Sequence, residues 1–277
     1  MDRLLIAGFG DIARRALPLL APRFEVCRLS RRDGLDLDRP ATLQLARADA
    51  VLHCAPPPAS GETDVRTANL LAALDRAGNP PSRFVYISTS GVYGDCGGAL
   101  VDESRPLNAQ TGRARRRVDA ERRLERWCAQ RGVPLVILRA PGIYAGDRLP
   151  VERLHAGTPV LRAEDDVFTN HIHADDLAAA AARALEQDAP AGVYNISDDS
   201  EIRMGDWMDL VAEHARLPKP PRLPRSVIAD HVSADALSFM NESRRLDNRR
   251  MKSVLRLRLR YPTVREGLAH EHAIGVD

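Results

Sequence analysis

A glycine-rich turn near the N-terminus has the spacing of a dinucleotide site. Residues 8–13 read GFGDIA, a G-x-G-x-x-A pattern between an apolar run and an amphipathic one. The first glycine of such a turn permits a tight bend, the second lets a pyrophosphate approach the backbone, and the alanine lets helix and strand pack closely. The N-terminus of the following helix would face the phosphates. We therefore assign the turn to a dinucleotide site: Gly8, Gly10, Asp11, Ile12 and Ala13.

The end of the next apolar run bears on the choice between NAD and NADP. An NAD site usually has a carboxylate there, which binds the ribose 2′-hydroxyl. This chain has Ser30, Arg31 and Arg32 instead, and a guanidinium suits a 2′-phosphate. We therefore favour NADP(H) over NAD(H), although a solvated arginine pair is the alternative. Further residues assigned to the cofactor site are Asp36, near the expected adenine edge, and Cys54, Ala55 and Pro56, which end the third apolar run.

These residues need a sheet to position them, and the pattern of the chain predicts one. Strands are expected at 3–10, 24–30, 49–56, 83–90 and 134–140, and helices at 11–22, 41–48, 64–78 and 113–131. Continuous apolar strands between helices are typical of an α/β fold with a doubly wound parallel sheet of the Rossmann type.

After Pro141 the alternation becomes less regular. Strands are expected at 165–173 and 192–197, helices at 174–187 and 204–215, and a proline-rich link at 217–226. The tail, 232–277, mixes polar helix with a basic strand-like run. We predict a Rossmann domain from 1–142 and 167–197, and a smaller C-terminal cap or substrate domain from 143–166 and 198–277.

Composition narrows the class of protein. The 277 residues are 44% hydrophobic, which is ample for a real core, and the net charge of +2 argues against an obligatory polyanionic partner. The four cysteines are scattered without a CxxC pair, which argues against zinc. With no signal peptide pattern and no apolar run near ~20 residues, we expect a cytoplasmic protein without membrane or nucleic-acid partners, either monomeric or homodimeric.

Later motifs resemble a known family. The segments VYISTSGVYGD (85–95), VILRAPGIYAGDR (136–148) and NHIHADDLA (170–178) are similar to motifs of extended short-chain dehydrogenases/reductases, the NAD(P)-dependent epimerase/dehydratase group. The tail, RRLDNRRMKSVLRLRLRYPTVREGL (244–268), resembles that of the narrower, atypical YeeZ-like branch. Together these matches cover nearly the whole chain.

The resemblance implies a catalytic set of a Ser or Thr, a Tyr, a Lys four residues later and a supporting Asn. Thr89 matches the Ser/Thr position, and Asp64 falls near that of the Asn. The Tyr and Lys positions fall on Thr111 and Arg115 or on Arg113 and Arg117, depending on the frame. No YxxxK sequence exists anywhere in the chain, and only two of its 40 basic residues are lysines. A guanidinium with a pKa above ~12 cannot relay a proton near neutrality.

Other side chains could replace the missing tyrosine as the proton donor. Tyr93, Tyr144 or water is the candidate proton donor, although packing or substrate contact is the alternative role of both tyrosines. His53 ends a core strand, and we expect it to be structural. His171 and His173, followed by Asp175 and Asp176, are expected to position the start of a helix rather than to bind metal.

Two arginine-rich stretches allow a second interpretation, nucleic-acid binding. Six arginines lie within 113–123, but Asp119, Glu121 and Glu125 interleave with them at helical spacing, which predicts ion pairs on a solvated face. The run LRLRLR at 255–260 predicts an edge strand with leucines inward. Neither stretch has interleaved aromatic residues for base stacking.

Two hypotheses of function therefore remain open. The first is an atypical NADP(H)-dependent oxidoreductase or epimerase/dehydratase acting on a small hydroxyl, carbonyl or sugar-like substrate. The second is a non-catalytic protein that binds NADP(H) as a sensor or scaffold.

Overall fold

The computed structural model describes residues 1–78 and 80–271, and its centre is a six-stranded sheet. The strand order is β11-β6-β4-β3-β1-β2, and all neighbours are parallel. The strands are β1 (Asp2–Ala7), β2 (Phe24–Leu29), β3 (Ala50–His53), β4 (Arg83–Thr89), β6 (Leu135–Ala140) and β11 (Gly192–Asn195). Nearly every residue of β3 and β4 is buried, as expected for parallel strands covered on both faces.

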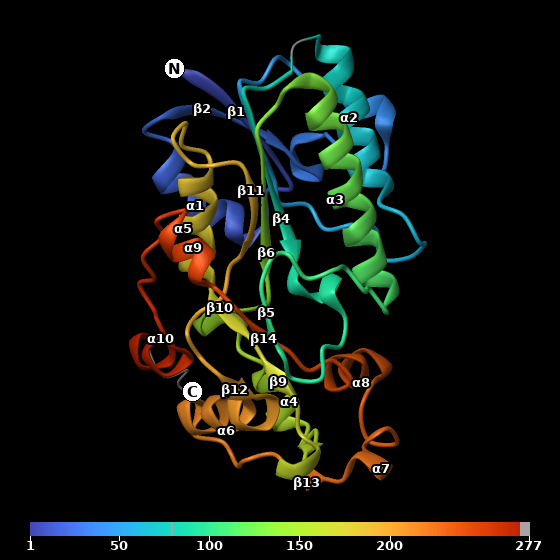
Figure 1. Cartoon of the computed structure of the whole chain (residues 1–277), viewed down its shortest axis with the longest axis vertical. Helices are drawn as coiled ribbons and strands as arrows, with labels where there is room; N and C mark the ends of the chain where they lie inside the picture. The colour runs from blue at the N-terminus through green and yellow to red at the C-terminus, as the bar shows by residue number, and fades with distance from the viewer. Residues whose placement is uncertain (79, 272–277) are drawn as a thin grey trace.

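Helices cover both faces of this sheet (Figure 1). On one face, α1 (Asp11–Leu20) packs against α5 (Ala174–Ala184), and their apolar residues join one core cluster with the sheet. On the other face, α2 (Val65–Ala77) and α3 (Gly112–Arg131) contribute to a second cluster. The predicted Rossmann-type doubly wound sheet is thereby confirmed.

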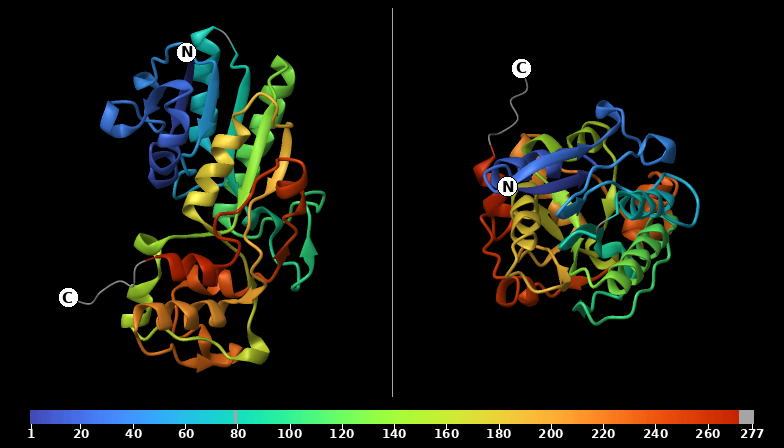
Figure 2. Two further views of the ribbon diagram at one scale, coloured as in Figure 1. Left: turned by 90° about the vertical axis from the view of Figure 1, so that its left-hand side faces the viewer. Right: turned by 90° about the horizontal axis from the view of Figure 1, so that it is seen from above.

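The remaining elements gather beyond the carboxyl ends of the strands (Figures 1 and 2). The helices there are α4 (Val151–His155), α6 (Met204–Ala215), α7 (Arg225–Ile228), α8 (Ala234–Met240) and α10 (Val264–His270). Short pairs of strands join them to the rest: β5 (Leu100–Val101) with β14 (Arg245–Leu246), β7 (Gly142–Tyr144) with β10 (His171–His173), β8 (Val160–Leu161) with β13 (Arg222–Leu223), and β9 (Phe168–Thr169) with β12 (Ile202–Arg203).

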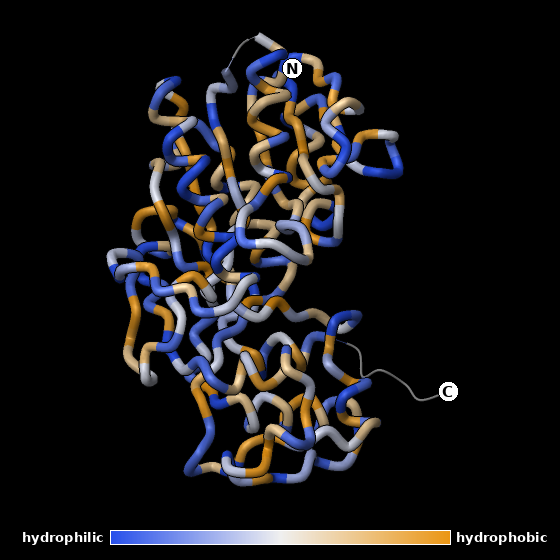
Figure 3. The backbone as a smooth tube through the Cα atoms, turned by 90° about the vertical axis from the view of Figure 1, so that its right-hand side faces the viewer, coloured by the Kyte–Doolittle hydropathy of each residue, from blue (hydrophilic) through white to orange (hydrophobic). Residues whose placement is uncertain are grey.

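The C-terminal segment returns to the sheet instead of staying with these helices. Helix α9 (Arg249–Ser253) packs beside β11, and Met251, Leu255 and Leu257 belong to the core cluster of α1 and α5. The domain boundaries stay a prediction, and this segment lies within the predicted smaller domain. Figure 3 shows hydrophobic stretches inside both groups of elements, with hydrophilic turns outside.

Two predicted elements are wrong. Residues 41–48 do not form a helix. The chain has a single 3-10 turn at Pro40–Thr42 and no regular structure over 43–48. Leu43 and Ala48 are nevertheless buried. The run 255–260 is not an edge strand either, since Arg256 adopts a φ of 59°. The alternation of the sequence still predicts burial correctly, because Leu255 and Leu257 are buried whereas Arg256 and Arg258 are exposed.

No helix within 1–78 and 80–271 combines the length and apolar character that a bilayer crossing requires.

Candidate functional site

The glycine turn joins β1 to α1, and its two glycines have different tasks. Gly8 has a φ of +90°, and a Cβ there would lie 2.5 Å from the backbone nitrogen of Ala55, after β3. Gly10 is the N-cap of α1 without a side-chain cap, and a Cβ there would meet no heavy atom within 4 Å. Gly8 therefore allows two chain segments to touch, while Gly10 leaves open space before a helix N-terminus, where a phosphate group can be bound.

A cavity of about 330 Å³ lies at this turn. Nine of the twelve residues assigned to the cofactor site line it: Gly8, Gly10, Ser30, Arg31, Arg32, Asp36, Cys54, Ala55 and Pro56. The other three do not. Ile12 and Ala13 are buried in the core, and the Asp11 carboxylate pairs with Arg15 and Arg148. The cavity is also lined by Phe9, Arg14 and Arg66, which the sequence did not predict. Of these, Arg14 could have been found from its position one turn into α1.

The carboxylates around this cavity accept hydrogen bonds or form an ion pair. The Ser30 hydroxyl donates to Asp33, and an oxygen of Asp36 accepts the backbone N–H of Asp38 at 3.0 Å. Asp38 pairs with Arg66 at 2.6 Å, and this hydrogen bond lowers the pKa of Asp38. Arg14, Arg31 and Arg32 form no ion pair within the described part of the chain, and the four arginines that line the cavity outnumber its two carboxylates, so the cavity has an excess of positive charge. The described ion pairs near it involve Arg66, Arg15 and Arg148.

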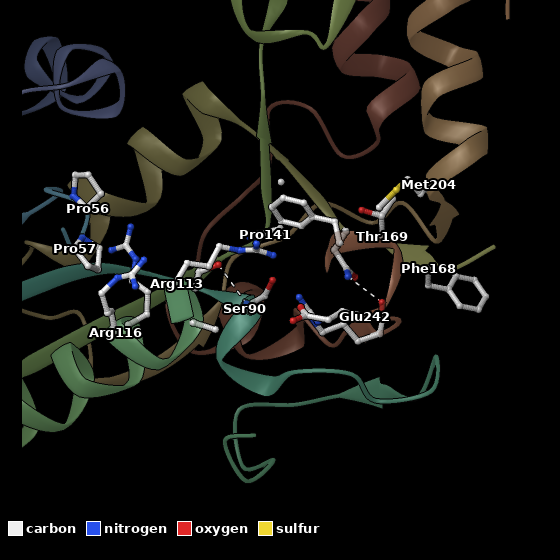
Figure 4. A pocket seen from close by; sticks show the side chains of 18 of the residues that line it. Pro56, Pro57, Ser90, Arg113, Arg116, Pro141, Phe168, Thr169, Met204 and Glu242 are labelled. Carbon is white, nitrogen blue, oxygen red and sulfur yellow. Dashed lines mark hydrogen bonds and ion pairs between the residues drawn. The ribbon is translucent and has the colours of Figure 1, made fainter. Parts of the chain in front are cut away.

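A second cavity, of about 450 Å³, adjoins the first, and Pro56 lines both. It lies over the carboxyl end of β4, where Thr89 and Ser90 contribute, and beside α3. Segments from elsewhere close it: the loop 56–59, Pro141 and Gly142 after β6, residues 168–170, Met204, and Phe239 to Arg244. Figure 4 shows Ser90, Arg113 and Glu242 facing this cavity from three different segments. We call the two the cofactor cavity and the substrate cavity.

The structure distinguishes the two frames that the sequence left open on α3. Thr111 is the N-cap of α3, and its hydroxyl accepts the backbone N–H of Ala114 at 3.3 Å. Arg115 is exposed and pairs with Glu62 at 2.6 Å. Arg113 and Arg117, one turn apart, line the substrate cavity together with Thr89. The pair at the cavity is therefore Arg113 and Arg117.

The arginines of α3 that face this cavity have neutral partners. Arg113 donates to the Ser238 hydroxyl at 2.7 Å, and its guanidinium lies 3.9 Å from the centroid of the Phe239 ring. Arg117 donates to the Tyr86 hydroxyl at 3.0 Å and to the carbonyl of Ile87 at 2.9 Å.

Arg116, the third of these arginines, holds the loop that both cavities share. It donates to the carbonyl of Gly61 at 2.7 Å and to that of Ala59 at 3.0 Å. None of the three arginines forms an ion pair with a carboxylate in the residues that the structure describes. The ion pairs of α3 there are Arg115–Glu62, Arg123–Asp119, Arg139–Glu121 and Arg131–Asp75.

A profile described as the NAD dependent epimerase/dehydratase family matches residues 13–197. The chain belongs to this NAD dependent epimerase/dehydratase family. The resemblance to extended short-chain dehydrogenases/reductases is thereby confirmed, whereas the YeeZ-like branch stays a prediction.

Individual relatives of this epimerase/dehydratase chain agree with that assignment. A Streptomyces protein named 3-diazoavenalumate denitrifying reductase is 28% identical over 259 residues, covering 85% of this chain and 84% of the relative. A functionally unknown conserved protein from Silicibacter pomeroyi is 28% identical, with a TM-score of 0.79 and 97% of each chain covered. Human epimerase family protein SDR39U1, solved with NADPH, is 20% identical, with a TM-score of 0.75 and coverage of 96% of this chain and 97% of the human one. This last likeness shows the shared fold.

Neither tyrosine considered as a proton donor of this epimerase/dehydratase chain lies at the substrate cavity. Tyr93 is 1% exposed, donates to the amide oxygen of Asn195 at 2.8 Å and accepts from Arg139 at 2.9 Å. Burial raises its pKa to about 12. Tyr144 is also 1% exposed, contacts the carbonyl of Thr263 at 3.3 Å, and has a pKa raised by burial. Because buried hydroxyls with internal partners cannot reach a substrate, we withdraw both from the catalytic set.

Asp64, near the expected Asn position, is a helix cap. It is fully buried, and one of its oxygens accepts the backbone N–H groups of Arg66 at 3.0 Å and Thr67 at 3.1 Å. His53 lies beside it, 2.9 Å from the Thr67 hydroxyl, and burial lowers its pKa to about 4. A neutral, hydrogen-bonded histidine at the end of β3 fits the structural role that the sequence predicted.

The IHADD motif (172–176) caps α5 and connects it to α1. His173, not an aspartate, is the N-cap of α5, where its Nδ1 accepts the backbone N–H of Asp175 at 3.2 Å. Asp175 pairs with Arg15 of α1 at 2.8 Å. Asp176 accepts the backbone N–H groups of Arg260 at 2.7 Å and Tyr261 at 2.9 Å, which holds the C-terminal segment against α5.

Glu121 does not lie on a solvated face, contrary to the prediction. Arg123 does pair with Asp119 at 2.7 Å along α3, as expected. Glu121, however, is fully buried and pairs at 2.7 Å with Arg139 of β6, with a further bond from the Ser88 hydroxyl. This pair anchors α3 to the sheet through a partner 18 residues away in sequence, which helical spacing cannot reveal.

Proposed function

We propose that the protein is an atypical NADP(H)-dependent oxidoreductase that acts on a small hydroxyl or carbonyl compound without the usual Tyr–Lys pair. One observation carries the proposal: the cofactor cavity, built on the glycine turn, adjoins a second cavity that holds Thr89 and the two arginines at the Tyr and Lys positions. Met204, Phe239, Glu242 and Arg244, all within the predicted smaller domain, supply one wall of this second cavity.

The distribution of charge supports NADP(H) as the cofactor. Ser30, Arg31 and Arg32 follow β2, where an NAD site usually has a carboxylate, and Arg14 faces the same cavity. Four arginines line the cavity against two carboxylates, and one of these, Asp38, is paired with Arg66, so an excess of positive charge remains. A 2′-phosphate with up to two negative charges would gain charge-assisted hydrogen bonds here that a ribose hydroxyl would not.

Each residue at the substrate cavity then has a physical role. The bound dinucleotide supplies or accepts a hydride at the reacting carbon. Thr89 accepts the N–H of Gly91 at 3.2 Å, so its own proton is free for a hydrogen bond to the substrate oxygen. Arg117, which is held at β4 by Tyr86 and Ile87, would stabilise negative charge as it develops on that oxygen. Because a guanidinium does not give up its proton, water delivers the proton that converts the reduced carbonyl to an alcohol.

The proposal is tested by binding and turnover of the purified chain. Dissociation constants of NADPH and NADH are measured for the wild type and for Arg31→Asp, with Arg39→Asp as a control at an exposed position outside the cavity. We expect Arg31→Asp to weaken NADPH by ~10-fold or more relative to NADH, the usual size of one charged hydrogen bond. An unchanged ratio of the two constants would contradict the NADP(H) assignment.

The second candidate function, a non-catalytic NADP(H) sensor, is favoured because no tyrosine is among the described residues that line the substrate cavity. Turnover separates the two. NADPH absorbance is followed with a panel of small aldehydes and ketones, and the reverse reaction is followed with NADP⁺ and the matching alcohols. Consumption by the wild type that Thr89→Val reduces would support the enzyme. Tight NADPH binding without turnover across the panel would support the sensor.

A further inference from the structure

The substrate cavity has a strong excess of positive charge. Four arginines line it, namely Arg113, Arg116, Arg117 and Arg244, and Glu242 is its only carboxylate among the residues described. The three arginines on α3 have hydroxyl or carbonyl partners, which do not neutralise them. Burial lowers the pKa of Arg113, so the cavity partly desolvates this cation. A partly desolvated, unneutralised guanidinium favours an anionic ligand.

Buried polar atoms without partners mark one wall of the cavity. Arg244 is 9% exposed, and one terminal nitrogen donates to the carbonyl of Gly94 at 2.7 Å and to Glu242 at 2.9 Å. Its Nε has no partner, and neither has Oε1 of Glu242, a residue that is 7% exposed. Buried donors and acceptors are nearly always satisfied in folded proteins. An unpaired donor and an unpaired acceptor on two residues that line the cavity therefore fit a ligand that has both an anionic oxygen and a polar hydrogen.

The rest of the lining is apolar. Phe168, Met204, Phe239 and Pro141 contribute, and Phe239 is held under the guanidinium of Arg113 at 3.9 Å. This arrangement places flat apolar surface next to positive charge. The nicotinamide ring must also enter this cavity of about 450 Å³, and the space that remains suits a small acid.

We propose that the substrate cavity binds a small organic carboxylate with a flat apolar body, held by Arg113 of α3 and Arg244 of the segment before β14. The apolar body packs against Phe239, and Glu242 accepts a hydrogen bond from a hydroxyl or N–H of the same molecule. This inference rests on the proposed function, since it names the class of substrate for the same site. It gives the arginine-rich start of α3 a task that the missing tyrosine and lysine left unexplained.

A binding experiment tests the inference without requiring turnover. Binding of NADPH is measured first, and calorimetric titrations of the NADP⁺-saturated chain then use cinnamate, its neutral isostere cinnamamide, phenyl phosphate and UDP-glucose. We expect cinnamate to bind most tightly, ~10-fold or more tighter than cinnamamide. Arg113→Gln should remove most of that difference. Arg115→Gln, on the same helix but turned toward Glu62, should retain it.

The outcomes separate this inference from the proposal on which it rests. A chain that binds NADPH but binds cinnamate no tighter than cinnamamide overturns the carboxylate site and leaves the oxidoreductase proposal intact. Tighter binding of phenyl phosphate or UDP-glucose than of cinnamate overturns it in favour of a phosphate ligand. Equal losses in Arg113→Gln and Arg115→Gln would show general surface electrostatics instead of a site. A chain that binds neither NADPH nor NADP⁺ refutes the proposed function itself.

Discussion

The cofactor cavity and the substrate cavity adjoin each other, but they are built in different ways. The first lies at the carboxyl ends of β1, β2 and β3, and its lining residues all come from the first 66 residues of the chain. The second collects side chains from segments between Pro56 and Arg244 and depends on long-range packing. The two cavities also differ in charge. Paired carboxylates lie among the arginines of the cofactor cavity, whereas the three α3 arginines of the substrate cavity have only neutral partners.

Different contacts therefore hold each cavity in place. The cofactor cavity depends on two glycines and a helix terminus. The substrate cavity depends on α3 being fixed to the sheet, so that Arg113 and Arg117 face inward while Arg115 faces outward. Substitutions that remove one of these supports and leave the other intact therefore test whether the two cavities are held independently.

The largest effect is expected from Glu121→Ala, which breaks the anchor of α3. Glu121 and Arg139 form a pair with side chains 1% and 5% exposed, so the change leaves a buried guanidinium without its carboxylate. Loss of one partner of a buried pair costs about 3–5 kcal/mol of unfolding free energy. Urea unfolding monitored by circular dichroism measures this loss.

Glu62→Ala is the matched control, because it removes an exposed partner of Arg115 on the same helix. An exposed pair contributes ~0–1 kcal/mol. Similar losses in the two variants would show that the buried pair does not anchor α3.

The next effect separates stability from cofactor binding at the glycine turn. Gly8→Ala places a methyl group 2.5 Å from the backbone nitrogen of Ala55 at a φ of +90°, and we expect a loss of about 2–4 kcal/mol from overpacking and backbone strain. Gly10→Ala meets no protein atom within 4 Å, so the chain should unfold within ~1 kcal/mol of the wild type. Its methyl group should nevertheless weaken NADPH, because it fills space that the phosphates need.

Thermal unfolding with and without NADPH measures both variants of the turn. Saturating NADPH should raise the melting temperature of the wild type more than that of Gly10→Ala. Equal ligand-induced shifts in these two proteins would remove Gly10 from the phosphate site.

The same comparison explains what the sequence could predict. The turn at Gly8 and Gly10, and Ser30 to Arg32 after β2, depend on local spacing, so the strand–turn–helix pattern was sufficient to find them. Ile12 and Ala13 belong to the same motif but face the core, because motif membership does not specify which side of a helix meets the cavity.

The substrate cavity could be predicted only in part. Thr89 came from the resemblance, which left two frames open on α3. Glu242 and Arg244 came from no pattern, since the tail segment is held at the cavity by long-range contacts such as the pairing of β14 with β5. Tyr93 and Tyr144 were misjudged for the same reason. Their partners Asn195 and Thr263 lie 102 and 119 residues away in the chain.

The last effect depends on pH and concerns a carboxyl group buried away from the arginines, at Asp198. This residue follows β11 and is 5% exposed; Oδ1 accepts the N–H of Ser200 at 2.9 Å, whereas Oδ2 has no partner. Burial raises the pKa of Asp198 to about 8. In the unfolded chain the pKa is ~3.9, so the folded chain retains a proton that the unfolded chain releases. Stability should therefore fall as the pH rises from about 4 to about 8.

Asp198→Asn removes this dependence, because an amide stays neutral throughout. The unfolding free energy of the variant relative to the wild type should increase by about 1 kcal/mol or more between pH 5 and pH 8. Urea unfolding at both pH values measures it, and Asp230→Asn, at an exposed aspartate, is the control. A relative stability that stays constant or decreases over this range would show that Asp198 is ionised in the folded chain. Its neighbourhood would then have to hold a compensating charge, as the arginines at the cofactor cavity do for Asp38.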